Sequence, residues 1–334
     1  MASTMKAAVY SEYGAPEVLQ VREWTKPGPK DNEILVKIHA TAVNSGDCRL
    51  RKADPFAVRF FFGLFRPKIQ ILGGVLSGEI EAVGKNVRRF KVGDPVFGST
   101  TMKFGAYAEY ICLPESGALA LKPEQLSHEE AAALPFGGVT AWHFLEKANI
   151  QPGQKVLIYG ASGAVGMAAV QIAKYLGAEV TGVCSAANAD AVRAFGADHV
   201  IDYAKTDFSK NGRQYDLVYE TVNKAPVAAC ATAVKKGGML ILGAAMLKES
   251  LQGVWASISA GIKVKSGVAV PAAKHLDFLK KIAEEGKIKA VIDRKYDLEQ
   301  IAEAHTYVDM GHKKGNVVIR IMHSEGLISN HPSF

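Results

Sequence analysis

The sequence predicts an α/β fold in which a doubly wound parallel sheet accompanies a β-barrel-like unit. Three observations predict it. Residues 5–120 are rich in short β-type runs that Gly and Pro turns separate. After residue 155, strand-like and helix-like segments alternate, which is typical of βαβ units. A Gly-rich turn joins the first strand and the first helix of that alternating part.

The N-terminal part supplies the β-type runs. Residues 33–40 alternate in polarity, and the alternation places Ile34, Val36 and Ile38 on one face of a strand. Two further runs follow, at residues 77–83 and 92–97. Many short strands with tight turns predict a compact barrel-like unit.

The alternating part is introduced by a helix. Ser127 stands three residues before Glu130 and ahead of an Ala-rich run, so these two residues predict an N-cap with a capping box. Strands are then predicted at residues 156–159, 179–184, 199–201, 217–219, 239–242, 264–270 and 317–321. Helices are predicted at residues 163–176, 190–195, 275–285 and 298–310.

Length, composition and charge exclude several classes of protein. A chain of 334 residues with 48% hydrophobic and 22% charged residues is typical of about two globular domains. Lys and Arg number 40 and Asp and Glu 33, so the net charge is 40 − 33 = +7. The basic residues form no dense block, and therefore we expect no nucleic-acid partner. We find no apolar run long enough to span a bilayer and no signal peptide, so membrane insertion is not expected and a cytoplasmic location is predicted.

The four cysteines, Cys48, Cys112, Cys184 and Cys230, are far apart in the sequence and form no CxxC pair. Zinc clusters of thiolates need closely spaced cysteines, so such a cluster is not expected. Scattered single cysteines are typical of a reducing compartment rather than of a disulfide scaffold.

The strongest local motif is the Gly-rich turn after the strand at 156–159. Its spacing is GxxGxxG, with Gly160 for a tight turn, Gly163 for close approach of the backbone to a pyrophosphate, and Gly166 for packing of helix on strand. Backbone N–H groups at the start of the next helix would face the phosphates. The predicted cofactor-binding residues of this loop are Gly160, Ala161, Ser162, Gly163, Ala164, Val165 and Gly166.

The end of the second strand of this unit bears on the choice of cofactor. NAD sites place Asp or Glu there to hold the ribose hydroxyls, whereas residues 183–188 contain no acidic side chain. A 2′-phosphate would meet no like charge, so NADPH is predicted and NADH stays possible. Ser185 and Tyr203 are candidate donors to the cofactor; the alternatives are a helix N-cap for Ser185 and a strand-end aromatic for Tyr203.

Several motifs together resemble the medium-chain dehydrogenase/reductase superfamily, in its zinc-independent quinone oxidoreductase-like branch. The resemblance covers nearly the whole chain. The motifs lie at residues 5–9, 43–47, 78–84, 90–96, 105–110, 134–142 and 152–158, and they lead into the Gly-rich turn. The resemblance implies a Rossmann domain at residues 124–271, inserted into a GroES-like catalytic domain at residues 1–123 and 272–334.

The resemblance also bears on metal binding. Zinc-dependent members carry a Cys where this chain has Asn44 and a His where it has Gly74. Glycine has no side chain that binds zinc, and zinc prefers Cys, His or carboxylate ligands. We therefore predict that the site holds no metal.

The reaction implied by the resemblance is NADPH-dependent reduction of a small hydrophobic quinone or an α,β-unsaturated carbonyl, such as an enone or enal. Conjugation spreads the developing charge onto a distant oxygen, so hydrogen-bond donors serve in place of a metal. The candidate catalytic residues are Asn44, Thr140 and Tyr107; the alternatives are a turn-stabilising Asn, a helix-entry Thr and a core Tyr. Asn44, Thr140 and Gly243 are also candidate cofactor contacts. The alternative function is a non-catalytic NADPH-binding sensor or scaffold protein.

Two further expectations concern surfaces. The predicted strand at 264–270 would pair across a two-fold axis and make a homodimer. Residues 60–65 contain four Phe between basic residues, and we interpret them as packed on the domain. An apolar lid over the substrate cleft and peripheral attachment to a membrane are the alternatives.

Overall fold

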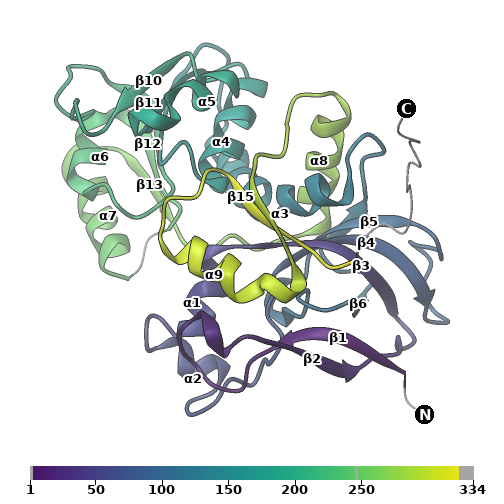
Figure 1. Cartoon of the computed structure of the whole chain (residues 1–334). Helices are drawn as coiled ribbons and strands as arrows, with labels where there is room; N and C mark the ends of the chain where they lie inside the picture. The colour runs from purple at the N-terminus through teal and green to yellow at the C-terminus, as the bar shows by residue number, and fades with distance from the viewer. Residues whose placement is uncertain (1–2, 245–246, 323–334) are drawn as a thin grey trace, which may run out of the picture.

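The computed structural model describes residues 3–244 and 247–322 and contains two large sheets, one above the other in Figure 1. The upper sheet is parallel and has six strands, in the order β10-β9-β8-β11-β12-β13. Its strands are β8 (Lys155–Tyr159), β9 (Glu179–Cys184), β10 (His199–Asp202), β11 (Tyr215–Glu220), β12 (Val234–Leu242) and β13 (Lys263–Ser266). The helices that follow these strands are α4 (Ala164–Tyr175), α5 (Ala189–Ala194), α6 (Val227–Ala233) and α7 (Leu247–Ala260).

Helices cover both faces of the parallel sheet, and β8 shows why. Val156 and Ile158 belong to the hydrophobic core on one face, whereas Leu157 belongs to the core on the other. Successive side chains of a strand point to opposite faces, so a strand in the middle of a doubly covered sheet is apolar throughout. This explains the continuous apolar run before Gly160. The sheet is the doubly wound, Rossmann-like sheet that the sequence predicts.

The lower sheet is largely antiparallel and has seven strands. They are β3 (Glu33–Val43), β4 (Val75–Val83), β5 (Pro95–Ser99), β6 (Tyr110–Pro114), β7 (Leu119–Leu121), β14 (Ile292–Asp297) and β15 (Asn316–Arg320). The long strand β3 pairs with β4, β6 and β15, and its register shifts twice against β4, which bends the sheet. Ile34, Val36 and Ile38 are buried on its inner face, as predicted. A hairpin of β1 (Thr4–Val9) and β2 (Gln20–Thr25) lies below this sheet (Figure 1).

Helix α3 (His128–Leu145) connects the two sheets. It packs on β3 and β4 of the lower sheet and on α4 of the upper unit. Its capping box is present as predicted: the Ser127 hydroxyl accepts from the Glu130 N–H, and the Glu130 carboxylate accepts from the Ser127 N–H. The remaining helices are α1 (Ser45–Lys52), α2 (Val58–Phe62), α8 (Ala273–Glu284) and α9 (Ile301–Asp309).

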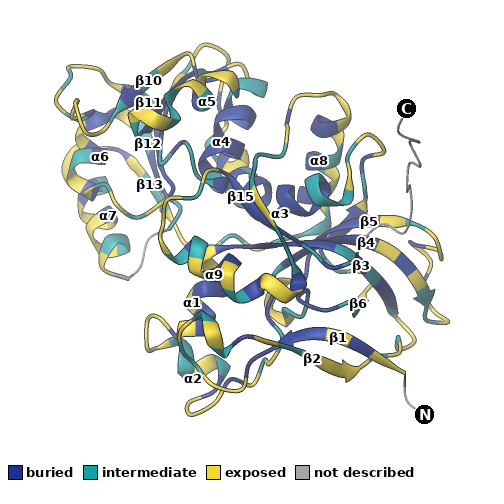
Figure 2. Ribbon diagram, in the orientation of Figure 1, coloured by how far each residue is buried: buried dark blue, intermediate teal, exposed yellow. Residues whose placement is uncertain are grey.

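One prediction is corrected in extent, and another is wrong. Strand β13 ends at Ser266 rather than at residue 270, because Gly267 adopts a positive φ of 136° and turns the chain away. Phe60, Phe61 and Phe65 do not pack on the domain but are exposed. Figure 2 shows exposed residues around α2. Only Phe62 of the group packs inward, against Phe104.

Several predictions are not tested by the structure. The domain boundaries at 123/124 and 271/272 stay predictions, and residues 323–334 of the expected catalytic domain lie outside the described residues. Of the helices in residues 3–244 and 247–322, none has both the length and the apolar character that crossing a bilayer requires. The cytoplasmic location stays a prediction.

Candidate cofactor-binding and active site

The Gly-rich turn lies at the carboxyl end of β8 and leads directly into α4. Gly160 has a positive φ of 80°, which L-residues with a side chain rarely adopt. The N–H groups of Gly160 and Ala161 both donate to the Val183 carbonyl at 3.0 Å, which fixes the turn against the neighbouring strand β9. Gly163 is the N-cap of α4, and because glycine has no side chain, no side-chain cap occupies the start of the helix. The N–H groups of the first turn of α4 are therefore oriented as a phosphate-binding helix start requires.

The three glycines of the turn face different surroundings. A Cβ on Gly166 would lie 2.1 Å from the Gly160 carbonyl oxygen, so only glycine lets the helix pack this closely on the turn. A Cβ on Gly163 would meet nothing nearer than the Gly160 oxygen at 3.6 Å. The backbone at Gly163 is thus open on its outer side. This open backbone at a helix start has the form that a pyrophosphate needs.

Ser185 and Tyr203 come together beside this turn. Ser185 follows β9, Tyr203 follows β10, and the Tyr203 N–H donates to the Cys184 carbonyl at 3.2 Å. Asn188, which our sequence reasoning did not single out, donates from Nδ2 to the Ser162 hydroxyl at 3.1 Å. Its Oδ1 is buried and has no hydrogen-bond partner in the described part of the chain. A buried acceptor without a partner costs free energy, which a ligand hydroxyl at this place would recover.

A segment from the far end of the chain closes the turn. The Gly315 N–H donates to the Ser162 carbonyl at 3.0 Å, and Gly315 forms a bridge with Gly163. A Cβ on Gly315 would lie 2.4 Å from the Val291 carbonyl oxygen, so this contact depends on glycine. Lys313 donates from Nζ to the Gly315 carbonyl at 2.5 Å. Burial lowers the pKa of Lys313 to about 8, although Asp293 and Cys48 oppose the shift.

Thr140 and Gly243 meet at Tyr219, at the carboxyl ends of β11 and β12. The buried Tyr219 hydroxyl donates to the Thr140 carbonyl at 3.5 Å, a long contact. A Cβ on Gly243 would lie 2.6 Å from the Tyr219 ring, and the Gly243 N–H donates to the Glu220 carbonyl at 2.8 Å. Gly137, one turn before Thr140, lets α3 approach the first residue of α4, since a Cβ there would lie 2.3 Å from the Ala164 oxygen.

Asn44 is the N-cap of α1. Its Oδ1 accepts from the N–H groups of Gly46 and Asp47 at 2.8 and 3.2 Å, and the Asp47 carboxylate accepts from the Asn44 N–H. The amide nitrogen Nδ2 has no recorded hydrogen bond within the described residues and lies 3.6 Å from the position of a Cβ on Gly74. Asn44 therefore has an amide donor that its capping role leaves available.

Strand pairing brings Asn44 toward the Gly-rich turn. Val43, the residue before Asn44, pairs with Val317, and Gly315 two residues earlier contacts Ser162. The turn, Lys313 and Asn44 thus belong to one neighbourhood, although they are far apart in the sequence.

Tyr107 does not border open space. It is fully buried, and its hydroxyl lies 3.2 Å from His305 Nε2. His305 Nδ1 in turn lies 3.5 Å from the Cys48 sulfur. Burial raises the pKa of Asp47 to about 7 and lowers that of His305 to about 3. Tyr107 thus belongs to a buried polar cluster with His305 and Cys48, and Asp47, next to Cys48 on α1, accepts from the Asn44 N–H.

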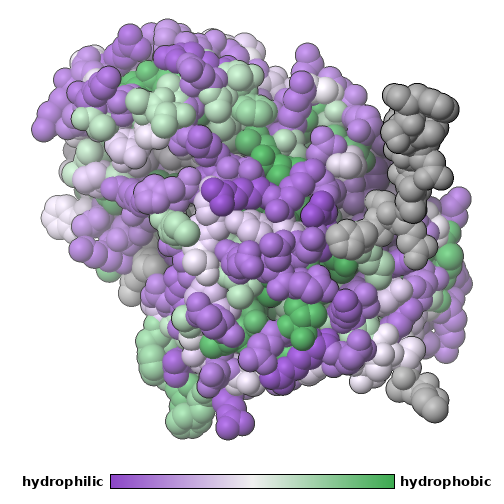
Figure 3. Space-filling view, in the orientation of Figure 1, coloured by the Kyte–Doolittle hydropathy of each residue, from purple (hydrophilic) through white to green (hydrophobic). Residues whose placement is uncertain are grey.

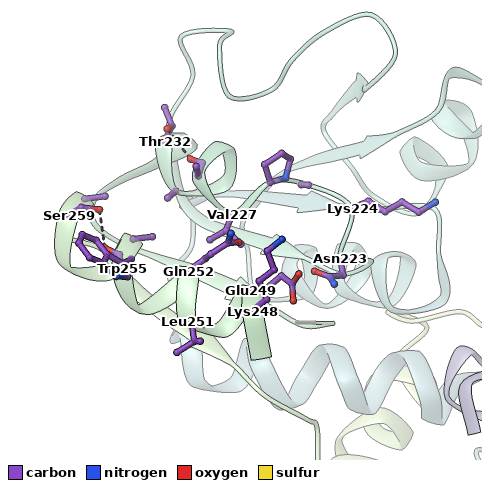
Figure 4. Close-up of a pocket in the computed structure, with 16 residues that line it drawn as sticks. Asn223, Lys224, Val227, Thr232, Lys248, Glu249, Leu251, Gln252, Trp255 and Ser259 are labelled. Atoms are coloured by element: carbon purple, nitrogen blue, oxygen red, sulfur yellow. Dashed lines mark hydrogen bonds between the residues drawn. The ribbon is translucent and has the colours of Figure 1, made fainter. Parts of the chain in front are cut away.

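A large pocket lies elsewhere. A cavity of about 1160 Å³ opens between α6 and α7, and Figure 4 shows Val227, Gln252 and Trp255 around it. Its lining includes none of the predicted site residues. Within residues 3–244 and 247–322, no group of three or more His, Cys, Asp or Glu side chains could hold a metal ion. The metal-free site stays a prediction, which rests on Asn44 and Gly74.

Two dehydrogenase family models match this chain, one in its N-terminal part and one in its C-terminal part. The alcohol dehydrogenase GroES-like domain matches residues 30–124, and the zinc-binding dehydrogenase family matches residues 195–319. A 2-methylene-furan-3-one reductase of Solanum lycopersicum is 31% identical over 332 residues, covering 95% of this chain and 79% of that protein. An NADPH-dependent alkenal/one oxidoreductase of Arabidopsis thaliana is 29% identical, with coverage of 94% and 79%.

Solved structures agree with these relatives. The quinone oxidoreductase of Coxiella burnetii superposes with a TM-score of 0.87 and 27% sequence identity, covering 96% of this chain and all of that one. The chain belongs to the medium-chain dehydrogenase/reductase superfamily, and its lower and upper units are the GroES-like and Rossmann-like parts of that architecture. Its relatives are quinone oxidoreductase-like proteins at about 30% identity.

Proposed function

We propose that the chain is an NADPH-dependent oxidoreductase that reduces a quinone or an α,β-unsaturated carbonyl without a metal. One observation carries the proposal: a glycine turn with an open backbone at Gly163 shares a neighbourhood with Asn44, whose amide nitrogen has no hydrogen-bond partner among the described residues. Relatives named as an alkenal/one oxidoreductase and a 2-methylene-furan-3-one reductase support this substrate class.

The residues around the turn fit a dinucleotide. Backbone N–H groups from Gly163 onward would hold the pyrophosphate, and Asn188 Oδ1 would accept from a ribose hydroxyl. Ser185 and Tyr203 remain candidate donors, and Thr140 and Gly243 remain candidate contacts nearer the reacting end. When bound, the reduced nicotinamide supplies the hydride. Lys313 would add a positive charge near the phosphates, the basic group that residues 183–188 lack.

In this reaction the protein itself would supply a hydrogen-bond donor to the acceptor. Reduction of a conjugated acceptor places negative charge on the carbonyl oxygen, and a fixed donor at that oxygen lowers the barrier. Asn44 Nδ2 is our candidate for this donor, because Oδ1 is already held by two backbone N–H groups that fix the orientation of the amide. Asp47 and Tyr107 are positioning residues in this proposal, since neither is exposed.

The substitution Asn44→Ser tests the donor role without removing the cap, because a Ser hydroxyl also accepts from the second and third N–H groups of a helix. We expect kcat for an enone to fall about 100-fold, which is typical for loss of one oxyanion donor, while NADPH affinity stays within about threefold. Unchanged kcat would remove Asn44 from the reaction.

The function itself is tested with purified protein and four acceptors: a quinone, an alkyl enone, an alkenal and a saturated aldehyde. We expect oxidation of NADPH, followed by absorbance, with the three conjugated acceptors only, and slower oxidation of NADH. Binding of NADPH with no turnover of any acceptor would instead favour the sensor or scaffold function. Turnover of the saturated aldehyde would contradict the reaction class.

Two organisational features are also proposed. The GroES-like catalytic domain would comprise residues 1–123 and 272–334, and the Rossmann domain would comprise residues 124–271. β13 is an outer strand of the parallel sheet, and pairing of two β13 strands across a two-fold axis would make a homodimer. A monomeric mass in analytical ultracentrifugation at micromolar concentration would contradict the dimer.

A further inference from the structure

Helix α2 and the turn after it carry a group of large apolar side chains that point away from the protein. Phe60, Phe61 and Phe65 are 68%, 79% and 85% exposed, and Phe56 and Leu64 are exposed beside them. We call Phe56, Phe60, Phe61, Leu64 and Phe65 the aromatic patch. In Figure 3, hydrophobic colour gathers at the lower left of the molecule, over the position of α2 in Figure 1. Contiguous exposed apolar surface of this kind marks an interaction site.

The segment that bears the aromatic patch has a defined conformation. The Tyr13 hydroxyl donates to the Gly63 carbonyl at 2.8 Å, and the Lys68 N–H donates to the Phe62 carbonyl at 2.8 Å. Arg59 lies half-buried beneath the segment, with its guanidinium 4.7 Å from the Tyr13 ring and 5.3 Å from the Phe56 ring. The exposed Phe side chains are therefore held outward by the backbone fold.

The segment that carries the aromatic patch is rich in basic residues. Residues 49–68 contain six Lys or Arg and a single acidic residue, Asp54. Arg49, Arg66 and Lys68 are exposed, and in the part of the chain that the structure describes none of them forms an ion pair. Unpaired cations around exposed aromatic rings match the two-layer chemistry of a bilayer surface, in which anionic headgroups lie above an apolar interior.

We propose that the aromatic patch docks the protein on a membrane surface that carries anionic lipid headgroups. Phe60, Phe61 and Phe65 enter the interface between headgroups and acyl chains, and Arg49, Arg66 and Lys68 meet the phosphates. A second copy of the chain fits this face less well, because a two-fold contact would bring the same three cations together. The contact is peripheral and includes no spanning segment.

The aromatic patch is continuous with the candidate active site. Phe62, on the inner side of α2, stacks edge-to-face on Phe104 with centroids 6.2 Å apart. Phe104 Cε1 lies 3.9 Å from the position of a Cβ on Gly74, which is 3.6 Å from Asn44 Nδ2. Docking would therefore bring the acceptor side of the site near the bilayer, where lipophilic quinones concentrate. The docking itself does not rest on the proposed reductase activity.

Vesicle co-sedimentation tests the proposal with the full-length protein. The probes are vesicles of phosphatidylcholine alone and of phosphatidylcholine with 30% phosphatidylglycerol, each in 50 mM and 500 mM NaCl. We expect at least about tenfold stronger partition to the anionic vesicles at low salt, and loss of that preference at high salt. No partition of the wild-type protein to anionic vesicles would overturn the proposal.

Two double variants locate the contact. Phe60→Ser with Phe65→Ser is expected to lower partition at least about tenfold, since each buried Phe contributes strongly to interfacial binding. Arg66→Glu with Lys68→Glu is expected to abolish the preference for anionic lipid. The matched control is Trp255→Ser with Ile258→Ser, which removes equally exposed apolar side chains from α7 and is expected to change partition less than twofold.

The same variants distinguish docking on lipid from a contact between copies of the chain. All substituted side chains are exposed, so we expect unchanged thermal unfolding midpoints, and turnover of a water-soluble enone within about twofold of wild type. Equal loss in the α7 control would contradict a role for the aromatic patch. A change from dimer to monomer in the Phe variant would assign the face to a contact between copies and overturn the proposal. Failure of the reductase assay leaves the vesicle result unaffected.

Discussion

The two halves of the candidate site are built in different ways. On the Rossmann-like side, the turn of Gly160, Gly163 and Gly166 relies on backbone groups and on the absence of side chains. On the GroES-like side, the backbone N–H groups of Gly46 and Asp47 hold the Asn44 side chain, and the Asp47 carboxylate accepts from the Asn44 N–H. In the proposed function, the first half would bind the cofactor through an open backbone, and the second would act through a side-chain amide. Substitutions in the first half should therefore weaken cofactor binding, whereas substitutions in the second should leave it nearly unchanged.

The largest effect is expected in the glycine turn. Gly166→Ala places a methyl group 2.1 Å from the Gly160 oxygen, and the backbone must move to accept it. We expect the free energy of unfolding to fall by about 3 kcal/mol, as for overpacking, and NADPH binding to weaken at least about 100-fold. Urea denaturation and a fluorescence titration with NADPH measure the two quantities.

The matched control for that change is Gly163→Ala in the same turn. Its methyl group would point into open space, so the loss of stability should stay below about 1 kcal/mol while NADPH binding still weakens. Equal stabilities of the two variants would show that helix packing does not depend on Gly166.

The next effect concerns the buried cluster on the other side. Tyr107→Phe removes the hydroxyl that lies 3.2 Å from His305 Nε2 and leaves this buried ring nitrogen without that partner. We expect about 2 kcal/mol lower stability in urea, because buried polar groups lose a hydrogen bond, and less than a twofold change in NADPH affinity.

Tyr10→Phe is the control for this experiment. The Tyr10 hydroxyl is buried in the same core and has no hydrogen-bond partner in residues 3–244 and 247–322. Its removal should leave stability unchanged or raise it slightly. The cluster would lose its supporting role if Tyr107→Phe cost no more than Tyr10→Phe.

A smaller effect is expected where the two halves meet. Lys313 has a lowered pKa of about 8, so its charge is present below that pH and disappears above it. NADPH affinity should therefore weaken as the pH rises from 7 to 9. Lys313→Met should lower affinity about tenfold at pH 7 and remove this pH dependence.

Lys314→Met provides the comparison, since Lys314 is exposed and adjacent in sequence. Calorimetric titration with NADPH at several pH values measures both variants. An identical pH dependence in wild type and Lys313→Met would exclude Lys313 as its source.

The smallest effect concerns the junction of α3 with the lower sheet. The His128 ring stacks on the His39 ring, with centroids 4.4 Å apart, and hydrogen-bonds to Ser77. Burial lowers the pKa of His128 to about 4. Between about pH 6.5 and pH 4 the unfolded chain takes up a proton that the folded chain does not, so stability falls as the pH falls. Because His128 is partly exposed, we expect a loss on the order of 1 kcal/mol.

His128→Gln should flatten this part of the pH profile of urea unfolding, whereas His312→Gln, at an exposed position, should not. A wild-type profile that stays level from pH 6.5 to pH 4 would rule out the contribution.

The difference between the two halves of the site also explains which features could be predicted from sequence. The parallel sheet and its turn follow from local patterns: apolar runs, glycine spacing and the capping box at Ser127. The N-cap at Asn44 also has a local signal, Asp47 three residues later, which our sequence reasoning did not use. By contrast, the cluster of Tyr107, His305 and Cys48 joins segments that only the folded chain brings together. Packing partners of this kind have no signature in a single sequence.

The errors have physical causes as well. An apolar run predicts burial on average, but Phe60, Phe61 and Phe65 stay outside because Gly63 and the contacts of Tyr13 fix the turn in another direction. The strand predicted to residue 270 stops at Gly267, where a positive φ breaks the pairing. No sequence pattern indicated Lys313 as a site residue, because its proximity to the turn depends on the contact of Gly315 with Ser162.

The contact between Gly315 and Ser162 has a consequence for how the protein is made. Synthesis proceeds from the N-terminus, so the turn at residues 160–166 leaves the ribosome long before the segment that closes it. In the proposed function, the nascent chain would hold only half of its nucleotide site until Gly315 is in place. Affinity for the cofactor would then develop late in synthesis, and a ligand that binds only the finished site would stabilise complete chains over partial ones.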